Sequence, residues 1–209
     1  MFFFYRKPLF FSEGTPLRQV DLKTKTLKIG FHTGPMEPGK VYSGGSSETF
    51  SELIGSVGRE VLYIGDHIYG DILKSKKIRG WRTFLVIPEL RMELETYTEN
   101  YHHIKNLFAR DSELGALFKN CDSSSCIKPN TTELRNKIRE TCHQLDLCYG
   151  LLGSIFRSGS RQTHFANQIT RYADLYSSTY LNLLHYSFAY FFRAPRMLVS
   201  IKFFFFYSS

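Results

Sequence analysis

Two acidic residues follow a short apolar stretch at a spacing that suits metal chemistry. Residues 61–64 read Val-Leu-Tyr-Ile, a β-rich apolar run that predicts a buried strand. Gly65 and Asp66 end this run, and Asp71 follows five residues after Asp66. Parallel α/β sheets bind ligands beyond the carboxyl ends of their strands, so we expect Asp66 at that edge and Asp71 near the first turn of the next helix. Two hard oxygen ligands there suit Mg²⁺, which takes few carboxylates, several waters and a substrate phosphate.

The residues around these acids predict a strand–helix–strand unit that positions them. From Ile68 to Lys77 the apolar residues can share one helical face, and Gly80 is a stop signal. Residues 81–87 form a second apolar run that Pro88 closes. A strand, a helix and a strand over about thirty residues predict a right-handed βαβ crossover of a parallel sheet.

The spacing Gly-Asp-x-x-x-x-Asp resembles the fourth motif of the haloacid dehalogenase superfamily, phosphotransferases with an aspartyl nucleophile and Mg²⁺. The longer string GDHIYGDILKSKK…GWRTFLVIPEL is similar to the cytosolic purine 5′-nucleotidase family, which dephosphorylates IMP and GMP. The resemblance extends from about Arg6 to Arg193 and implies a cytoplasmic, Mg²⁺-dependent hydrolase of purine nucleoside 5′-monophosphates. Four further segments carry it: RKPLFFSEGTPLRQVD, VYSGGSSETF, CYGLLGSIFRSGSRQ and RYADLY.

The resemblance also implies roles for individual residues. Lys7 matches the family's third motif, a lysine that contacts the transferred phosphate, where a compact positive charge opposes developing negative charge. Asp66 would then bind Mg²⁺, and Asp71 would orient Lys7 and the metal shell. Without the resemblance, Lys7 reads as an exposed lysine at a strand edge. His67 is interpreted as a packing residue or a neighbour of the metal ligands.

A regulatory site for purine nucleotides and phosphorylated effectors is a further implication of the resemblance. An aromatic ring beside a cation suits a nucleoside phosphate, and a solvated helix face is the alternative interpretation. Arg171 and Asp174, in the same RYAD segment, are weaker candidates. Four positions match that effector site: Tyr69, Lys77, Gln168 and Tyr172.

Two other segments could receive an anion. Residues 42–47 are small or hydroxyl-bearing and precede an apolar-periodic segment that Gly58 ends, so they could bind phosphate or simply cap a helix. The run Arg157-Ser158-Gly159-Ser160-Arg161 could bind an anion or form a surface turn.

The predicted fold class is α/β: a partial haloacid-dehalogenase-like, Rossmann-like parallel sheet with a β-hairpin and a helical C-terminal region. Residues 6–90 are expected to form the C-terminal part of the core with the third and fourth motifs, and 91–195 the helical region. The hairpin is expected from residues 17–20 and 27–31. The aromatic stripe at helical spacing in 165–192 predicts core or subunit interface. Helices are expected over 89–103, 105–119 and 131–152.

The family's first motif, Asp-x-Asp, is not in this sequence, and neither are its second motif and the cap that grips the base. We therefore expect only the C-terminal part of such an enzyme, without the nucleophile strand, and negligible turnover by the chain alone. The alternatives are a non-catalytic nucleotide-binding or oligomerisation fragment, and a nonfunctional truncated product. Residues 1–5 and 196–209 are atypical Phe-rich ends, and one hypothesis is translated polypyrimidine intron sequence in a faulty gene model.

The composition indicates which classes of binding partner to expect. A net charge of +8 over 209 residues favours anionic compounds. No dense Lys/Arg run accompanies a nucleic-acid motif, so nucleic acid is not expected as a partner. No apolar run is long enough to cross a membrane, so a membrane is not expected either. The four cysteines lack C-x-x-C spacing and are expected as free thiols in a reducing cytosol. The resemblance implies a homo-oligomer in the intact family.

Overall fold

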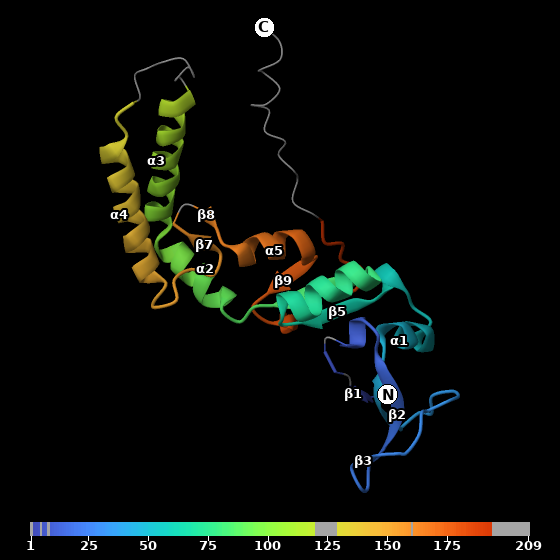
Figure 1. Ribbon diagram of the computed structural model, residues 1–209. Coiled ribbons are helices and arrows are strands. Elements are labelled where there is room, and N and C mark those ends of the chain that lie inside the picture. The colour runs from blue at the N-terminus through green and yellow to red at the C-terminus, as the bar shows by residue number, and fades with distance from the viewer. Residues whose placement is uncertain (1, 5, 8, 120–128, 160, 194–209) are drawn as a thin grey trace.

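The computed structural model describes residues 2–4, 6–7, 9–119, 129–159 and 161–193. Its elements follow one another along an extended path, with a small sheet at one end, a parallel sheet in the middle and a helical hairpin at the other end (Figure 1). The Phe-rich stretch 196–209, the loop expected at residues 122–125, and Cys121 and Cys126 lie outside the described residues. Cys142 and Cys148 carry free thiols.

A parallel three-stranded sheet occupies the centre of the chain, with strand order β5-β6-β9. It consists of β5 (Leu62–Gly65), β6 (Arg82–Val86) and β9 (Leu175–Ser177), and both pairings are parallel. Strands β5 and β6 fall on the two predicted apolar runs, so the α/β class with a parallel sheet is confirmed. The expectation of a helical aromatic segment over 165–192 is wrong in part, because β9 lies inside it.

The crossover between β5 and β6 is helical, as predicted, but it is wound more widely than an α-helix. It comprises π-helical segments η3 (Ile68–Leu73) and η4 (Ser75–Arg79). The backbone N–H groups of Asp71 and Ile72 both donate to the carbonyl oxygen of His67, at 2.9 and 3.3 Å. Gly80 ends the segment at φ 68°, a left-handed conformation that suits glycine. Such π-helical turns occur frequently at functional sites.

Two buried clusters hold the crossover in place. Ile72 of η3 and Leu85 of β6 are fully buried and pack with Ile169 of α5 (His164–Tyr172), which therefore lies against the crossover. The second cluster, called here the aromatic cluster, consists of Phe10, Phe11 and Trp81 with Phe50, Val61 and Tyr63 packed against it. It joins the 3₁₀ turn η1 (Leu9–Phe11) to the first strand of the parallel sheet.

The smaller sheet has strand order β1-β4-β2-β3. The predicted hairpin is confirmed as β2 (Thr15–Asp21) and β3 (Thr26–Leu27), although its second strand ends at residue 27 rather than 31. Strand β1 (Phe2–Phe4) pairs parallel with β4 (Val41–Gly45). Helix α1 (Ser47–Ile54) follows β4 and ends at Gly55, with φ 65°, rather than at Gly58. Gly58 instead begins the 3₁₀ turn η2 (Gly58–Glu60).

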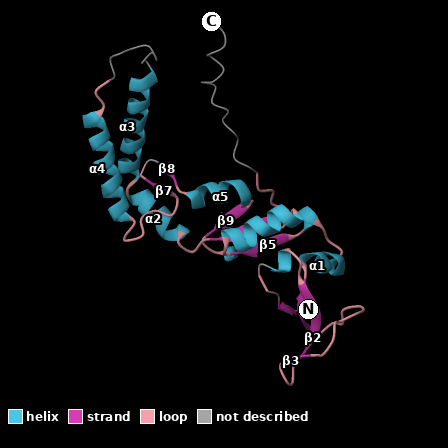
Figure 2. Cartoon of the chain, in the orientation of Figure 1, coloured by secondary structure: helices cyan, strands magenta, loops and turns pink. Residues whose placement is uncertain are grey.

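The three helices expected after residue 88 are present with shifted bounds. They are α2 (Leu90–Glu99), α3 (Tyr101–Lys119) and α4 (Thr132–Cys148), drawn as cyan coils in Figure 2. Ile104 and Leu107 of α3 pack against Leu145 of α4. A short hairpin of β7 (Arg157–Ser158) and β8 (Arg161–Gln162) leads to α5, and the 3₁₀ turn η5 (Tyr180–His185) follows β9. Within the described ranges, every helix is too short or too polar to span a bilayer.

Asp174 ties the start of β9 to the crossover and to β6. Its carboxylate pairs with the Lys76 ammonium and with the Arg82 guanidinium, the latter at 3.2 Å. It also accepts the backbone N–H of Thr83 at 2.9 Å. Partial burial raises the pKa of Asp174, but the Lys76 and Thr83 hydrogen bonds outweigh it and hold the pKa below the ordinary 3.8.

Asp174→Asn is expected to lower the free energy of unfolding at neutral pH by about 1–2 kcal/mol, because charge-assisted hydrogen bonds are lost. The folded-state pKa lies below the unfolded value of 3.8, so this contribution is present above pH 3.8 and disappears as pH falls through the folded pKa. Urea denaturation of both proteins from pH 7 to pH 3 measures the difference. Asp146→Asn, on exposed α4 surface, is the control and should change stability by less than about 0.5 kcal/mol. A constant Asp174→Asn deficit at every pH would contradict the prediction.

Candidate functional site

The carboxylate of Asp71 is fully buried in η3 and accepts donors from three parts of the chain. The Lys7 ammonium nitrogen lies 2.7 Å from Oδ1. The Tyr63 hydroxyl of β5 donates to the same oxygen at 3.0 Å, and the backbone N–H of His67 donates to Oδ2 at 3.2 Å. A buried charge is tolerated only when it is paired and hydrogen-bonded, and these three donors supply that compensation.

The aromatic cluster positions two of those donors. Tyr63 stacks on Trp81 with ring centroids 5.9 Å apart, and its ring meets Phe11 edge-on at 5.3 Å. Lys7 lies two residues before η1, which holds Phe10 and Phe11 in the same cluster. Hydrophobic packing therefore brings a segment distant in sequence, with its lysine, to the carboxyl end of β5.

Gly65 leaves the space that the Asp71 carboxylate occupies. A Cβ atom at position 65 would lie 2.6 Å from Asp71 Cβ and 2.7 Å from its Oδ2. Separations this short are not tolerated, so the last residue of β5 must be glycine. Sequence reasoning treated Gly65 only as the end of a strand; its pairing with an acid six residues later was the available signal.

His67 caps the crossover. Its Nδ1 accepts the backbone N–H groups of Tyr69 and Gly70 at 3.2 and 2.9 Å. Two otherwise unsatisfied donors at the helix start are thereby satisfied. These contacts give His67 a structural role beside the acids.

A pocket of about 530 Å³ opens over this arrangement. Asp66 is exposed at its wall, directly after β5, whereas Asp71 is buried beneath it. Asp66 is therefore the carboxylate that a cation can reach, and Asp71 is the partner of Lys7. One accessible carboxylate at the wall of an open pocket fits Mg²⁺, which completes its shell with water and substrate oxygens. Among the residues whose placement is described, no group of three or more His, Cys, Asp or Glu could form a richer metal site. The lining residues are Lys7, Asp66, His67, Tyr69, Gly70, Asp71 and Lys74.

Three of the four residues expected at an effector site, Tyr69, Lys77 and Tyr172, take part in contacts between the crossover and α5. The Lys77 ammonium lies 5.0 Å from the centroid of the Tyr172 ring, and the Arg171 guanidinium lies 5.5 Å from it. Tyr69 stacks near His164, with centroids 6.5 Å apart and an interplanar angle of 21°. Gln168 lies on α5 between His164 and Tyr172. Sequence reasoning missed His164, which follows the turn of Arg161 and begins α5.

The two expected anion segments have different surroundings. In the first, Ser46 Oγ accepts the backbone N–H of Thr49 at 3.2 Å, so Ser46 caps α1 as ordinary helix capping predicts. In the second, Arg157 and Arg161 lie on β7 and β8, and the Arg157 guanidinium lies 4.8 Å from the Phe108 ring centroid. Residue 160 of that turn lies outside the described residues.

Comparison with known proteins matches residues 4–201 to the 5′ nucleotidase family. The chain belongs to that family. It is 31% identical over 183 residues to a 5′-nucleotidase domain-containing protein of Dictyostelium discoideum. The match covers 86% of this chain and 30% of that relative, so the chain spans about a third of the relative's length.

Gly65→Ala in this 5′-nucleotidase family chain is expected to lower the free energy of unfolding by about 1–3 kcal/mol, because the added Cβ displaces the buried Asp71 carboxylate. Thermal unfolding followed by circular dichroism measures the change. Gly115→Ala is the matched control: Gly115 lies within α3, nothing lies within 4 Å of its Cβ position, and alanine there should stabilise by up to about 1 kcal/mol. Equal stability of Gly65→Ala and wild type would show that Asp71 is not held against Gly65.

Proposed function

We propose that this chain provides the cation- and phosphate-binding part of a Mg²⁺-dependent 5′-nucleotidase. Its substrates would be purine nucleoside 5′-monophosphates of the IMP and GMP type, its products nucleoside and phosphate, and its location the cytoplasm. The observation that supports this most is a single pocket in which the lysine held by buried Asp71 lies beside exposed Asp66. Family membership supports the reaction class in general.

Each residue has a defined task in the proposed reaction. Lys7, with 43% of its side chain exposed, presents its ammonium to the pocket while Asp71 fixes its orientation and stabilises its charge. That ammonium would stabilise the negative charge that builds on the phosphoryl oxygens. Asp66 would hold Mg²⁺, which when bound supplies a Lewis acid for the phosphate. Tyr63 keeps the Asp71 carboxylate in place through its hydroxyl.

Covalent phosphoryl transfer also requires a carboxylate nucleophile with an adjacent acid–base residue. The family's pattern for this pair is Asp-x-Asp, and none of this chain's aspartates are separated by a single residue. Asp71 cannot serve as the nucleophile, because it is buried and engaged by three donors. The chain by itself should therefore bind but not turn over its substrate.

A second candidate function is non-catalytic nucleotide binding. The Lys77 ammonium over the Tyr172 ring, with Arg171 on the same ring, places cations and an aromatic face together as a purine nucleotide effector requires. Tyr69 and Gln168 would complete that effector site. Assembly into homo-oligomers would use exposed aromatic side chains such as those of Phe188 and Phe191.

Mg²⁺ is expected to strengthen IMP binding to the purified chain by about tenfold, since Asp66 would hold the ion and its charge would attract the phosphate group. Titration calorimetry with IMP, with and without Mg²⁺, measures this, and a phosphate-release assay should detect negligible turnover. Asp66→Asn should abolish the Mg²⁺ effect, whereas Asp146→Asn, which removes the same charge from α4, should leave it intact. IMP affinity that is independent of Mg²⁺ in all three proteins would contradict the proposal. Turnover that depends on Asp66 would overturn the expected inactivity.

A further inference from the structure

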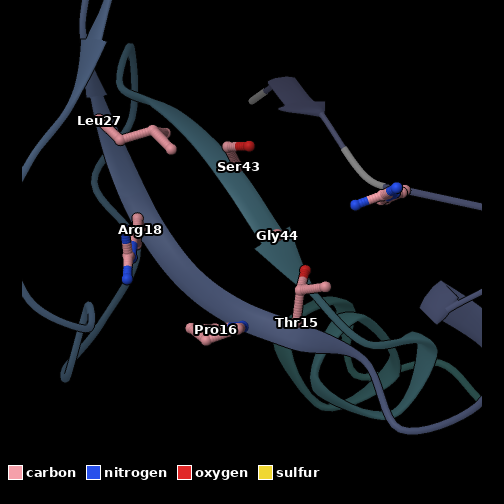
Figure 3. A pocket seen from close by; sticks show the side chains of 7 residues that line it. Thr15, Pro16, Arg18, Leu27, Ser43 and Gly44 are labelled. Carbon is pink, nitrogen blue, oxygen red and sulfur yellow. The ribbon is translucent and has the colours of Figure 1, made fainter.

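A second pocket, of about 360 Å³, lies on the smaller sheet (Figure 3). Its walls come from the paired strands β2 and β4 and from the segment that precedes η1. Arg18 of β2 and Ser43 of β4 are cross-strand neighbours, so their side chains share one face of the sheet. The lining residues are Arg6, Thr15, Pro16, Arg18, Leu27, Ser43 and Gly44.

Arg18 contributes a buried donor without an acceptor. Its Nε is shielded from solvent and has no hydrogen-bond partner in the described part of the chain. A buried guanidinium N–H left unsatisfied is costly, and most such groups in native proteins are satisfied by protein, by water or by an ion. The unsatisfied N–H shows that the described chain does not meet the full hydrogen-bonding capacity of Arg18, a side chain that lines the pocket.

The chemistry of the lining selects an anion. Two guanidinium groups, of Arg6 and Arg18, and two hydroxyls, of Thr15 and Ser43, can donate hydrogen bonds, and the lining includes no carboxylate. Across the ranges that the structure describes, no ion pair joins either arginine to an acidic side chain. Guanidinium forks match phosphate oxygens bidentately, and hydroxyls can bond the remaining oxygens.

The backbone keeps this pocket open. The register between β2 and β4 shifts between Thr15 and Arg18, a bulge of the kind that re-aims side chains. Gly44 makes the bulge possible: a Cβ there would lie 2.2 Å from the Pro16 carbonyl oxygen, and its φ of 90° suits glycine. The sheet thus fixes the backbone that carries Thr15, Arg18 and Ser43, whereas Arg6 comes from the segment before η1.

We propose that this pocket is a phosphoryl-anion site separate from the pocket of Asp66 and Asp71. Its ligand is inorganic phosphate or the phosphate group of a small ester such as a nucleoside monophosphate. Arg6 lines this pocket while the next residue, Lys7, lines the other, so the two sites lie on either side of one short segment. The site does not depend on Mg²⁺ or on Asp66.

Titration calorimetry of the full 209-residue chain at low ionic strength without Mg²⁺, first with inorganic phosphate and then with GMP, tests this site. Wild type should bind saturably. Arg18→Gln should weaken binding by about tenfold or more, and Arg18→Lys nearly as much, because lysine restores the charge but not the fork. Ser43→Ala should weaken it several-fold without removing charge. Arg59→Gln is the matched control, since Arg59 is an exposed arginine outside the pocket.

The possible results of this titration either support the phosphoryl-anion site or overturn it. Binding that Arg18→Gln weakens belongs to this site: tighter binding of GMP than of phosphate then identifies an ester as its ligand, and equal or weaker binding of GMP identifies phosphate. Absence of saturable binding, equal weakening by Arg59→Gln, or full binding by both Arg18→Lys and Ser43→Ala would overturn it. Circular dichroism melts identify variants that fail to fold; if Arg18 variants do, Ser43→Ala decides. Asp66→Asn should bind phosphate here as wild type does, so failure of the proposed nucleotidase role and failure of this site are distinguishable.

Discussion

The burial of one ionised carboxylate constrains the whole site. Asp71 has no exposed surface, so its charge is stable only while Lys7, Tyr63 and the backbone N–H of His67 remain within hydrogen-bond distance. These donors come from the segment before η1, from β5 and from the start of the crossover. Any rearrangement that separates them leaves a buried charge uncompensated, which costs several kcal/mol. The position of Lys7 therefore depends on the geometry of the crossover helix that carries Asp71, although the two residues are far apart in sequence.

Packing on either side of the crossover makes that arrangement rigid. On one side, the aromatic cluster joins Phe11, Trp81 and Tyr63, so the ring whose hydroxyl reaches Asp71 is fixed by its neighbours. On the other side, Ile72 packs between β6 and α5, and Asp174 ties the start of β9 to Lys76 and Thr83. The placement of Lys7 and Asp71 at the carboxyl end of β5 thus depends on packing contacts on both sides of the crossover. Asp66, by contrast, is exposed at the pocket wall, where a cation can reach its carboxylate.

Local pattern was enough to predict much of this. The runs at 61–64 and 81–87, with a helical segment between them, predicted β5, β6 and the crossover, because strand and helix periodicities are local properties. Strand β9 was missed, since three residues, Leu-Tyr-Ser, become a strand only through pairing with β6 some ninety positions earlier. The different surroundings of Asp66 and Asp71 were also beyond sequence, because burial depends on the tertiary position of Lys7 and Tyr63. The requirement for glycine at position 65 was also beyond sequence, because it follows from the distance between that position and the Asp71 side chain.

The most direct test of the account is a double-mutant cycle on the Lys7–Asp71 pair, with Lys7→Met, Asp71→Asn and the double variant compared with wild type by urea denaturation. Both side chains keep their approximate size, so the cycle isolates the interaction between charges. The expected coupling free energy is about 1–3 kcal/mol, because Asp71 is fully buried. Additive effects, with coupling below about 0.3 kcal/mol, would contradict it and would remove the physical basis for placing a catalytic lysine at this site.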